Sequence, residues 1–323
     1  MSTFARNDLK ILQKYFTVRR LNITTFLVPR RDRHWLAYFR LLKGILWADV
    51  VYAWWAELNA FFIVLFCVLL HKKSIIVVGG YEVAYVPAIN YGTLLSPIGR
   101  LEVKFILQHA SKIIAVSKSS EKEILSFVKP KALKLVYNGV DIERFKPSGD
   151  KENLVITVGG VSHGTINKKR LDTFVAASKY LTDVQFVMIG KIFNDSIKQL
   201  RSKASCNVKF TGYVSAESLL RYYQRAKVYC QLSTQESFGV ALAEAMSCGC
   251  VPVVTRKYSL PEIVGDAGFY VPYNDPEATA EAISEALISN KGLKARERIE
   301  TFFSLEKREQ ILLQEIVDVI RSR

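Results

Sequence analysis

The sequence predicts an α/β protein with two doubly wound, Rossmann-like domains. The chain has 323 residues, enough for two domains of about 150 residues each. Its second half alternates short apolar runs with longer amphipathic ones, the pattern of a parallel sheet covered by helices on both faces. Residues 138–153 are rich in charges and turn formers, which is typical of a domain boundary.

The first half begins with a charged segment where such a domain usually has an apolar strand and a Gly-containing turn. Either the first domain is unusual or it lacks its opening strand. Strands are predicted at Leu21–Leu27, Val50–Tyr52, Ser74–Val78, Lys112–Val116 and Leu133–Tyr137. Helices are predicted at Asn7–Tyr15, His34–Leu46, Leu58–Leu70, Leu101–His109 and Ser120–Phe127. Ser120 and Glu123 have the spacing of a capping box, which places the start of the last helix.

The second half has the more regular alternation of strands and helices. Its predicted strands are Leu154–Val158, Val184–Ile189, Val208–Thr211, Val228–Leu232 and Val251–Thr255. Its predicted helices are Lys169–Leu181, Ser196–Ser202, Ser218–Gln224, Gly239–Ser247 and Pro276–Leu287. The last stretch is predicted to be one long charged helix that returns to the first domain. The predicted division is therefore a first domain (1–140), a linker (141–152), a second domain (153–292) and a final helix (293–323).

Basic residues are concentrated in the first half. The net charge is +15, and residues 1–147 hold 22 Lys and Arg against 10 Asp and Glu. This excess predicts an anionic partner. In Arg33–Trp47, apolar residues recur near helical spacing between cations, which suits either a helix resting on an anionic membrane or an ordinary core-facing helix. Nucleic acid would use the same charges, but no recognisable nucleic-acid-binding module accompanies them, so this partner is disfavoured.

Several features bear on location and metals. The five cysteines include no C-x-x-C pair and are expected to be reduced, and the histidines show no metal-ligand spacing. The longest uncharged apolar run, Ala60–Leu70, is eleven residues, whereas a membrane-spanning helix needs about 20. We expect a cytoplasmic protein that is either soluble or peripheral on the inner face of a membrane.

The most informative segment runs from Gln235 to Thr255. Glu244 is the only charged residue between Gly239 and Thr255, and a carboxylate in an apolar helix costs several kcal/mol unless it is paired or hydrogen-bonded. It either makes an ion pair or a cap, or it accepts hydroxyl groups of a polyol ligand. Glu236 lies eight residues upstream, before a Gly-containing turn, and a helix that starts after such a turn favours phosphate.

This Glu236-x7-Glu244 segment resembles the signature of the retaining glycosyltransferases of family 4 (group 1), which have the GT-B fold. The resemblance implies that the two doubly wound domains face each other across a cleft. The resemblance covers about 112–287 well. Further motifs that carry it are Asn138-Gly139-Val140-Asp141 with Phe145 and Pro147, Val158-Gly159-Gly160, Lys169, Ile189-Gly190, Phe210-Thr211-Gly212-Tyr213 and Leu260-Pro261-Glu262-Ile263-Val264.

The resemblance implies a role for each matching residue. Glu236 and Lys169 are the implied catalytic residues: Glu236 holds the donor sugar and Lys169 neutralises the leaving diphosphate. Glu244 is implied to hold the ribose hydroxyls of a nucleotide-sugar. The other implied donor-binding residues are Ser237, Phe238, Gly239, Val240, Ala241, Gly160, Gly190, Gly212 and Tyr213. The N–H groups of Val240 and Ala241 are expected to face the diphosphate.

Two regions leave alternatives open. Many family members have an Arg soon after the Val-Gly that begins the second domain; at that place this sequence has His163, and the second cation for the diphosphate is Lys168, Arg170 or Lys191. His163 itself is a candidate for a role near the diphosphate. Gly80, Tyr81 and Glu82 follow a predicted strand and are either acceptor-side contacts or a plain turn.

Together these features predict a retaining glycosyltransferase that moves a hexose from a nucleotide-diphosphate sugar to an acceptor hydroxyl. The resemblance implies no metal and no cofactor beyond the donor substrate. The acceptor is a glycan, a lipid-linked molecule or a small metabolite. The alternatives are a non-catalytic nucleotide-sugar-binding homologue, a nucleotide-sugar epimerase of the same fold, and a nucleic-acid-binding protein.

Overall fold

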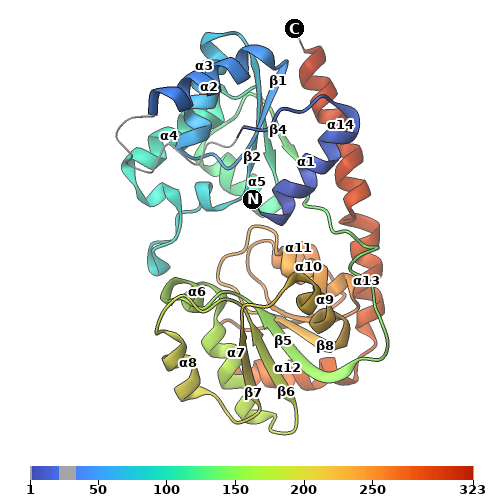
Figure 1. Ribbon diagram of the computed structural model, residues 1–323. Coiled ribbons are helices and arrows are strands. Elements are labelled where there is room, and N and C mark those ends of the chain that lie inside the picture. The colour runs from blue at the N-terminus through green and yellow to red at the C-terminus, as the bar shows by residue number, and fades with distance from the viewer. Residues whose placement is uncertain (1, 22–33, 323) are drawn as a thin grey trace. The chain divides into compact units, whose positions relative to one another are not determined.

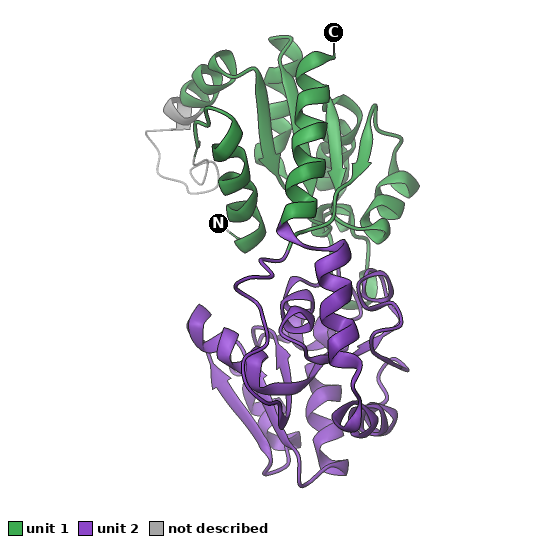
Figure 2. Ribbon diagram, turned by 90° about the vertical axis from the view of Figure 1, so that its right-hand side faces the viewer, with its two compact units in different colours: residues 1–139, 306–323 green, residues 140–305 purple. Residues whose placement is uncertain are grey.

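The computed structural model describes residues 2–21 and 34–322, and these form two compact units. The first unit combines residues 1–139 with 306–323, and the second comprises 140–305 (Figure 2). Each unit is built on one parallel sheet, so the α/β class and the doubly wound architecture predicted from the sequence are confirmed. The predicted strand at Leu21–Leu27 lies, apart from Leu21, outside the described residues.

The first unit has a four-stranded parallel sheet in the order β1-β2-β3-β4 (Figure 1). Its strands are β1 (Val50–Trp54), β2 (Lys73–Val78), β3 (Lys112–Ala115) and β4 (Leu133–Leu135). Its helices are α1 (Thr3–Tyr15), α2 (His34–Trp47), α3 (Leu58–Leu69), α4 (Pro97–His109), α5 (Lys118–Phe127) and most of α14 (Leu305–Arg321), with short 3-10 turns at Tyr81–Val83, Pro87–Ile89 and Thr93–Leu95.

Alternate residues of β2 pack into different layers of the first unit. Ile76 and Val78 join side chains of α3, α4 and α5 in one hydrophobic cluster. Ile75 and Val77, which point to the other face, are also fully buried. A β-branched run buried on both faces is the signal from which this strand was predicted.

The second unit has a six-stranded parallel sheet in the order β10-β9-β8-β5-β6-β7. Its strands are β5 (Glu152–Val158), β6 (Gln185–Ile189), β7 (Val208–Gly212), β8 (Ala226–Gln231), β9 (Val251–Thr255) and β10 (Phe269–Val271). The main helices are α6 (His163–Lys169), α7 (Leu171–Ala177), α8 (Ile197–Lys203), α9 (Ala216–Arg225), α10 (Val240–Ser247), α11 (Leu260–Val264), α12 (Pro276–Ile288) and α13 (Lys291–Phe302). The strand order reverses between β5 and β8, and ligands of such sheets bind at the carboxyl ends of strands beside that reversal.

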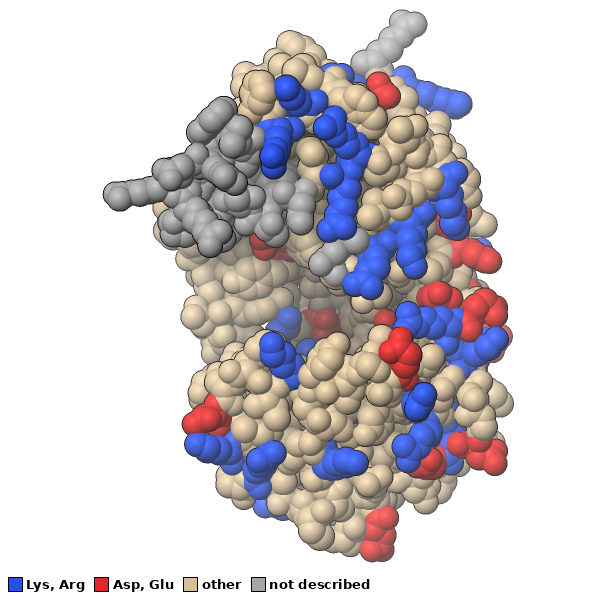
Figure 3. Space-filling view, in the orientation of Figure 1, with Lys and Arg blue, Asp and Glu red and all other residues tan. Residues whose placement is uncertain are grey.

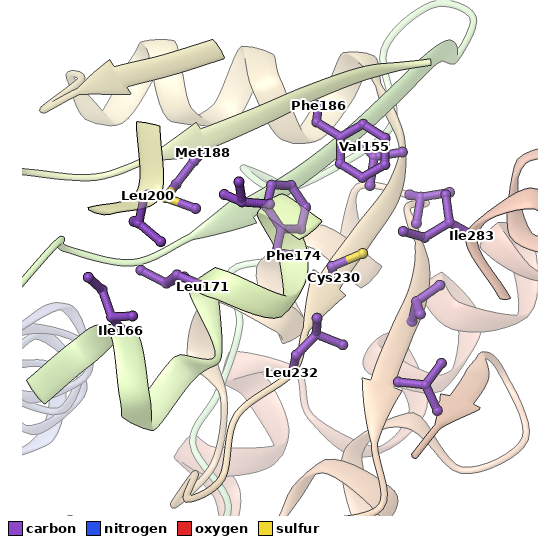
Figure 4. Close-up of a cluster of buried hydrophobic side chains, with 14 of the residues drawn as sticks. Val155, Ile166, Leu171, Phe174, Phe186, Met188, Leu200, Cys230, Leu232 and Ile283 are labelled. Carbon is purple, nitrogen blue, oxygen red and sulfur yellow. The ribbon is translucent and has the colours of Figure 1, made fainter. Parts of the chain in front are cut away.

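The core of the second unit packs one face of this sheet against α7 and its neighbours (Figure 4). Phe174 of α7 meets Phe186 of β6 edge-on, with 5.3 Å between ring centroids. Cys230 of β8 is fully buried in the same cluster, as a small hydrophobe. This packing joins β5, β6 and β8 in one core, and it fixes the positions from which the loops at their carboxyl ends begin.

Two predicted helices start too late, since α1 begins at Thr3 and not at Asn7, and α4 begins at Pro97 and not at Leu101. Three others differ in their interruption or their cap. The predicted helix 169–181 is interrupted at Arg170, which is left-handed (φ 50°) and separates α6 from α7. The predicted cap was wrong: Ser117 caps α5 and shares a reciprocal capping box with Ser120. The final helix is divided at Phe303–Ser304, where Val140 accepts a hydrogen bond from the Leu305 N–H and donates one to the Phe303 carbonyl.

The apolar residues predicted along α2 do not all face the core. Leu41 and Ile45 are buried against α3, whereas Phe39, Leu46 and Trp47 are about half exposed. The helix therefore has a core-facing side and an outer side that carries large apolar groups. None of the helices in the described ranges is both long enough and apolar enough to cross a membrane.

Candidate functional site

Glycines join three loops at the carboxyl ends of β5, β6 and β7. The Gly159 N–H donates to the Ile189 carbonyl at 2.9 Å, and the Gly190 N–H donates to the Gly212 carbonyl at 3.1 Å. Gly190 has φ +154°, and a Cβ there would lie 2.1 Å from the Gly159 carbonyl oxygen. A Cβ on Gly160 would lie 2.6 Å from the ring of Phe193. These predicted donor-site glycines thus keep the loops close together.

Lys169, the last residue of α6, lies against the first of these loops. Its ammonium group donates to the Val158 carbonyl at 3.1 Å. A Cβ on Gly159 would come within 2.7 Å of the Lys169 Cδ, so the glycine leaves the path of the lysine side chain open. Burial lowers the pKa of Lys169, and the nearby carboxylate of Glu236 partly offsets this. The structure therefore brings together the two predicted catalytic residues.

The three candidates for a second cation have different surroundings. Burial lowers the pKa of Lys168, and the charge of Glu236 offsets this in part. Arg170 pairs with Asp172 at 3.1 Å and donates to the Asn274 side chain. The ammonium of Lys191 lies 5.3 Å from the centroid of the Phe193 ring. Lys168 is thus the candidate whose pKa, like that of Lys169, is affected by the charge of Glu236.

His163 is exposed at the first turn of α6. Ser162 caps that helix by accepting from the Thr165 N–H. Among the residues that the structure describes, the imidazole makes no hydrogen bond or ion pair with the other candidate residues, and its predicted role near a diphosphate stays a prediction.

Glu236 lies in the loop between β8 and α10, and that loop is fixed from several sides. The Ser259 hydroxyl donates to the Glu236 carbonyl at 2.8 Å. The Thr234 N–H donates to the Lys168 carbonyl at 2.7 Å, which ties the loop to α6. The carboxylate itself accepts a hydrogen bond at 2.8 Å from the amide of Gln231, a residue that the motif analysis did not single out.

Glu244 is buried on α10, with 8% of its surface exposed. The Tyr223 hydroxyl donates to its Oε2 at 3.3 Å. Burial raises the pKa of Glu244 to about 7, and the Tyr223 hydrogen bond and the charge of Arg144 offset this only in part. Within the described parts of the chain no ion pair is formed by this carboxyl, so the ion-pair alternative has no support in the structure.

The turn before α10 leaves the first N–H groups of that helix without carbonyl partners. Gly239 is left-handed (φ 88°) at the N-cap position, and its carbonyl accepts from the Ala243 N–H at 3.0 Å. Phe238 is buried, with its ring 5.8 Å edge-on to that of Phe303. The N–H groups of Val240 and Ala241 belong to the first turn, where they have no carbonyl partner inside the helix. Ser237 is half-buried in the same turn.

Tyr213 follows β7 and is 78% exposed, while Gly212 before it is left-handed (φ 71°). The tyrosine ring is thus available to stack on a planar group, and its contribution to donor binding stays a prediction.

The predicted acceptor-side residues belong to the first unit. Glu82 is fully buried, and its Oε1 accepts from the backbone N–H groups of Gly79 at 2.9 Å and Ala56 at 3.1 Å. Burial raises its pKa. Glu82 therefore ties together the ends of β1 and β2, which supports the plain-turn alternative for this residue. Gly80 has φ +112°, and Tyr81 is 43% exposed.

The two parallel, doubly wound sheets have the GT-B fold. Residues 3–144 match the family "Glycosyltransferase Family 4" and residues 152–289 match "Glycosyl transferases group 1". The chain therefore belongs to family 4 of the group 1 glycosyltransferases, as the sequence motifs predicted.

Individual relatives agree with this assignment. O-antigen chain mannosyltransferase B of Escherichia coli is 40% identical over 80 residues, which is 25% of this chain and 21% of that protein. A subunit of the phosphatidylinositol N-acetylglucosaminyltransferase of Arabidopsis thaliana is 25% identical over 233 residues, or 68% of this chain and 51% of that protein. The crystal structure of Anabaena HepE with UDP and glucose has a TM-score of 0.76 at 17% identity, over 89% of this chain and 83% of that one. The chain thus spans about half the length, or less, of these two curated relatives.

Proposed function

We propose that the protein is a retaining, metal-independent glycosyltransferase that moves a hexose from a nucleotide-diphosphate sugar to an acceptor hydroxyl. The observation that carries the proposal is the shared position of Glu236 and Lys169. The acid lies in the loop after β8 and the lysine at the end of α6, and the hydrogen bond from the Thr234 N–H to the Lys168 carbonyl joins these two elements beside the strand reversal. The Glu236 carboxylate also partly offsets the lowering of the Lys169 pKa by burial.

Each part of a nucleotide-sugar has a matching group in the second unit. A ribose offers two hydroxyls, and the buried carboxyl of Glu244 is an acceptor of the kind they need. A diphosphate suits the first-turn N–H groups of Val240 and Ala241 together with the ammonium of Lys169. The free side of the Glu236 carboxylate is left for the donor sugar.

In the proposed reaction the bond between the anomeric carbon and the diphosphate oxygen breaks, and the electron pair leaves with the diphosphate. Lys169 and Lys168 stabilise the charge that develops there, which is the contribution that metal ions make in other enzymes. The acceptor oxygen then bonds to the anomeric carbon on the face that the diphosphate left, and its proton passes to the departing phosphate. Glu236 stabilises the positive charge of the sugar ring without forming a covalent bond.

We propose a lipid-linked acceptor at an anionic membrane surface. Lys and Arg gather on the part of the first unit visible in Figure 3. On α2 the exposed Phe39, Leu46 and Trp47 lie among the exposed Arg40 and Lys43, a combination that favours the interface of an anionic bilayer. The Arabidopsis relative, named for transfer to phosphatidylinositol, supports this acceptor class.

The proposed function is tested by thermal shift with UDP-, GDP- and ADP-sugars on the wild type and on Glu244→Ala. One donor is expected to raise the melting temperature of the wild type, because a ligand that binds only the native state stabilises it. The substitution is expected to abolish that shift. A wild type that no donor stabilises would refute the proposal.

A further inference from the structure

We propose that Gln231 is a positioning residue for Glu236, holding one carboxylate oxygen so that the other is presented to a hydroxyl of the donor sugar. The inference rests on the proposed function. Gln231 is the last residue of β8 and is 3% exposed. Its Nε2 donates to Glu236 Oε2 at 2.8 Å.

The surroundings of Gln231 allow only one orientation of its amide. The Tyr229 hydroxyl lies 3.0 Å from Gln231 Oε1, while Nε2 lies 2.7 Å from the Ser233 hydroxyl and 2.8 Å from Glu236 Oε2. An ionised carboxylate only accepts hydrogen bonds, so the NH2 group must face Glu236. Both amide hydrogens are then used, and Oε1 accepts from Tyr229. If the amide were turned by 180°, so that Oε1 and Nε2 exchanged places, the three hydrogen bonds could not all be kept.

The two carboxylate oxygens of Glu236 differ in their hydrogen bonds. Oε2 receives the Gln231 amide and, at 3.4 Å, the Ser233 hydroxyl. Oε1 accepts from no side chain in the parts of the chain that the structure describes, and the residue is only half-buried. One oxygen is therefore anchored by buried side chains and the other is not. A carboxylate fixed in this way meets a sugar hydroxyl without first losing rotamer freedom.

Tyr229 and Tyr223 extend this network to the second acid. Their rings lie side by side with centroids 6.1 Å apart, and both side chains are fully buried. Tyr223 donates to Glu244, whereas Tyr229 donates to the amide that holds Glu236. The sugar-side and ribose-side acids are thus each supported by a buried tyrosine. Tyr223 reaches Glu244 directly, whereas Tyr229 reaches Glu236 through the amide of Gln231.

The test compares donors with their nucleotides on Gln231→Met, which keeps the length of the side chain and removes its donor. Calorimetric titration measures affinity for UDP, UDP-glucose, GDP, GDP-mannose, ADP and ADP-glucose. The wild type is expected to bind one intact donor more tightly than its nucleotide. In Gln231→Met this preference is expected to fall about tenfold, the effect of losing a hydrogen bond to a charged group. Affinity for the nucleotide alone is expected to stay the same.

Two further variants separate positioning from general damage to β8. Cys230→Ala truncates the neighbouring side chain, which faces the hydrophobic core, and is expected to lower the melting temperature while leaving the donor preference unchanged. Combining Gln231→Met with Glu236→Gln is expected to add little to the loss of donor preference caused by Glu236→Gln alone, because both changes remove one interaction.

The outcomes separate the two proposals. Wild type that binds no nucleotide and no nucleotide-sugar refutes the proposed function and the role of Gln231 with it. Wild type that prefers a donor, with Gln231→Met that keeps the same preference, refutes the positioning role alone. Parallel losses of nucleotide and donor affinity in Gln231→Met also refute it, since they indicate damage to the whole site.

Discussion

Asp8 and Arg308 form a buried ion pair that joins α1 to α14, with Asp8 Oδ1 2.6 Å from the Arg308 Nε and each side chain 1% exposed. Arg308 also donates to the carbonyls of Val136 and Tyr137, and Asp8 accepts from Tyr52 and Trp54. The pair therefore fixes both ends of the chain to the sheet of the first unit.

Breaking this pair from one side is expected to be costly. Arg308→Met leaves the Asp8 carboxylate buried without its counter-charge, and we expect a loss of about 3–5 kcal/mol in the free energy of unfolding. Urea denaturation measures it. The double variant Asp8→Asn with Arg308→Met is expected to lose about 2 kcal/mol less than the sum of the single losses. Additive losses would show that the two side chains act separately.

Glu244 makes the stability of the ligand-free protein depend on pH. Its native pKa of about 7 lies above the ordinary value of 4.5, so between these values the native state binds a proton that the unfolded state does not. This contribution is present below pH 4.5 and is lost as the pH rises through 7, with a limit of about 3 kcal/mol. Glu244→Gln is therefore expected to gain stability relative to the wild type between pH 5 and pH 8. A difference that stays constant over this range in urea melts would contradict the assignment.

Gly159 is expected to matter because of the lysine beside it. In Gly159→Ala the new methyl group meets the flexible Cδ of Lys169 at 2.7 Å and displaces that side chain, while the backbone keeps its conformation. We expect a folded protein with transfer reduced about tenfold or more, because the diphosphate loses its cation. Gly164→Ala is the matched control, since nothing lies within 4 Å of its Cβ position. Equal activity of the two variants in a donor-turnover assay would be the contrary result.

The fold was predictable from runs of residues that carry their own signal. Ile75–Val78 and Val251–Thr255 are apolar and buried on both faces, as their composition indicates. The interruption at Arg170 was not predictable, because it depends on Asn274 and Asp172, and Asn274 is distant in sequence. Local propensity favours one continuous helix there, and tertiary contacts override it.

The candidate site, like the fold, could be predicted only in part from the sequence. Glu236 and Glu244 stand out because carboxylates are rare in apolar surroundings. Gln231 does not, since a neutral amide at a strand end is unremarkable until the fold places Tyr229 and Glu236 on either side of it. Its polar character in the run Val228–Leu232 was the only signal available, and it gave no partner.

The two lysines of α6 are expected to contribute unequally to transfer. Lys169→Met removes the cation that reaches the Val158 carbonyl beside the loop glycines, and we expect its kcat to fall about 100-fold or more. Lys168→Met is expected to have a smaller effect of the same kind. Lys191→Met is the control, because that ammonium lies over the Phe193 ring, and its rate is expected to match the wild type. Steady-state kinetics with saturating donor measures all three, and a rate loss in the Lys191 variant alone would reverse the assignment of the second cation.

Binding to anionic membranes is expected to depend on the outer side of α2. Lys43→Glu reverses an exposed charge near Phe39 and Trp47, and we expect it to weaken binding to vesicles by about 2 kcal/mol, since each basic side chain at an anionic surface contributes about 1 kcal/mol. Co-sedimentation with phosphatidylcholine vesicles, with and without phosphatidylserine, measures this. Lys198→Glu makes the same charge change on α8 of the second unit and is expected to bind like the wild type. Added salt is expected to weaken the binding of the wild type more than that of Lys43→Glu, because screening acts on the charge that the variant has lost. Wild-type binding that is indifferent to phosphatidylserine would exclude the anionic surface as a partner.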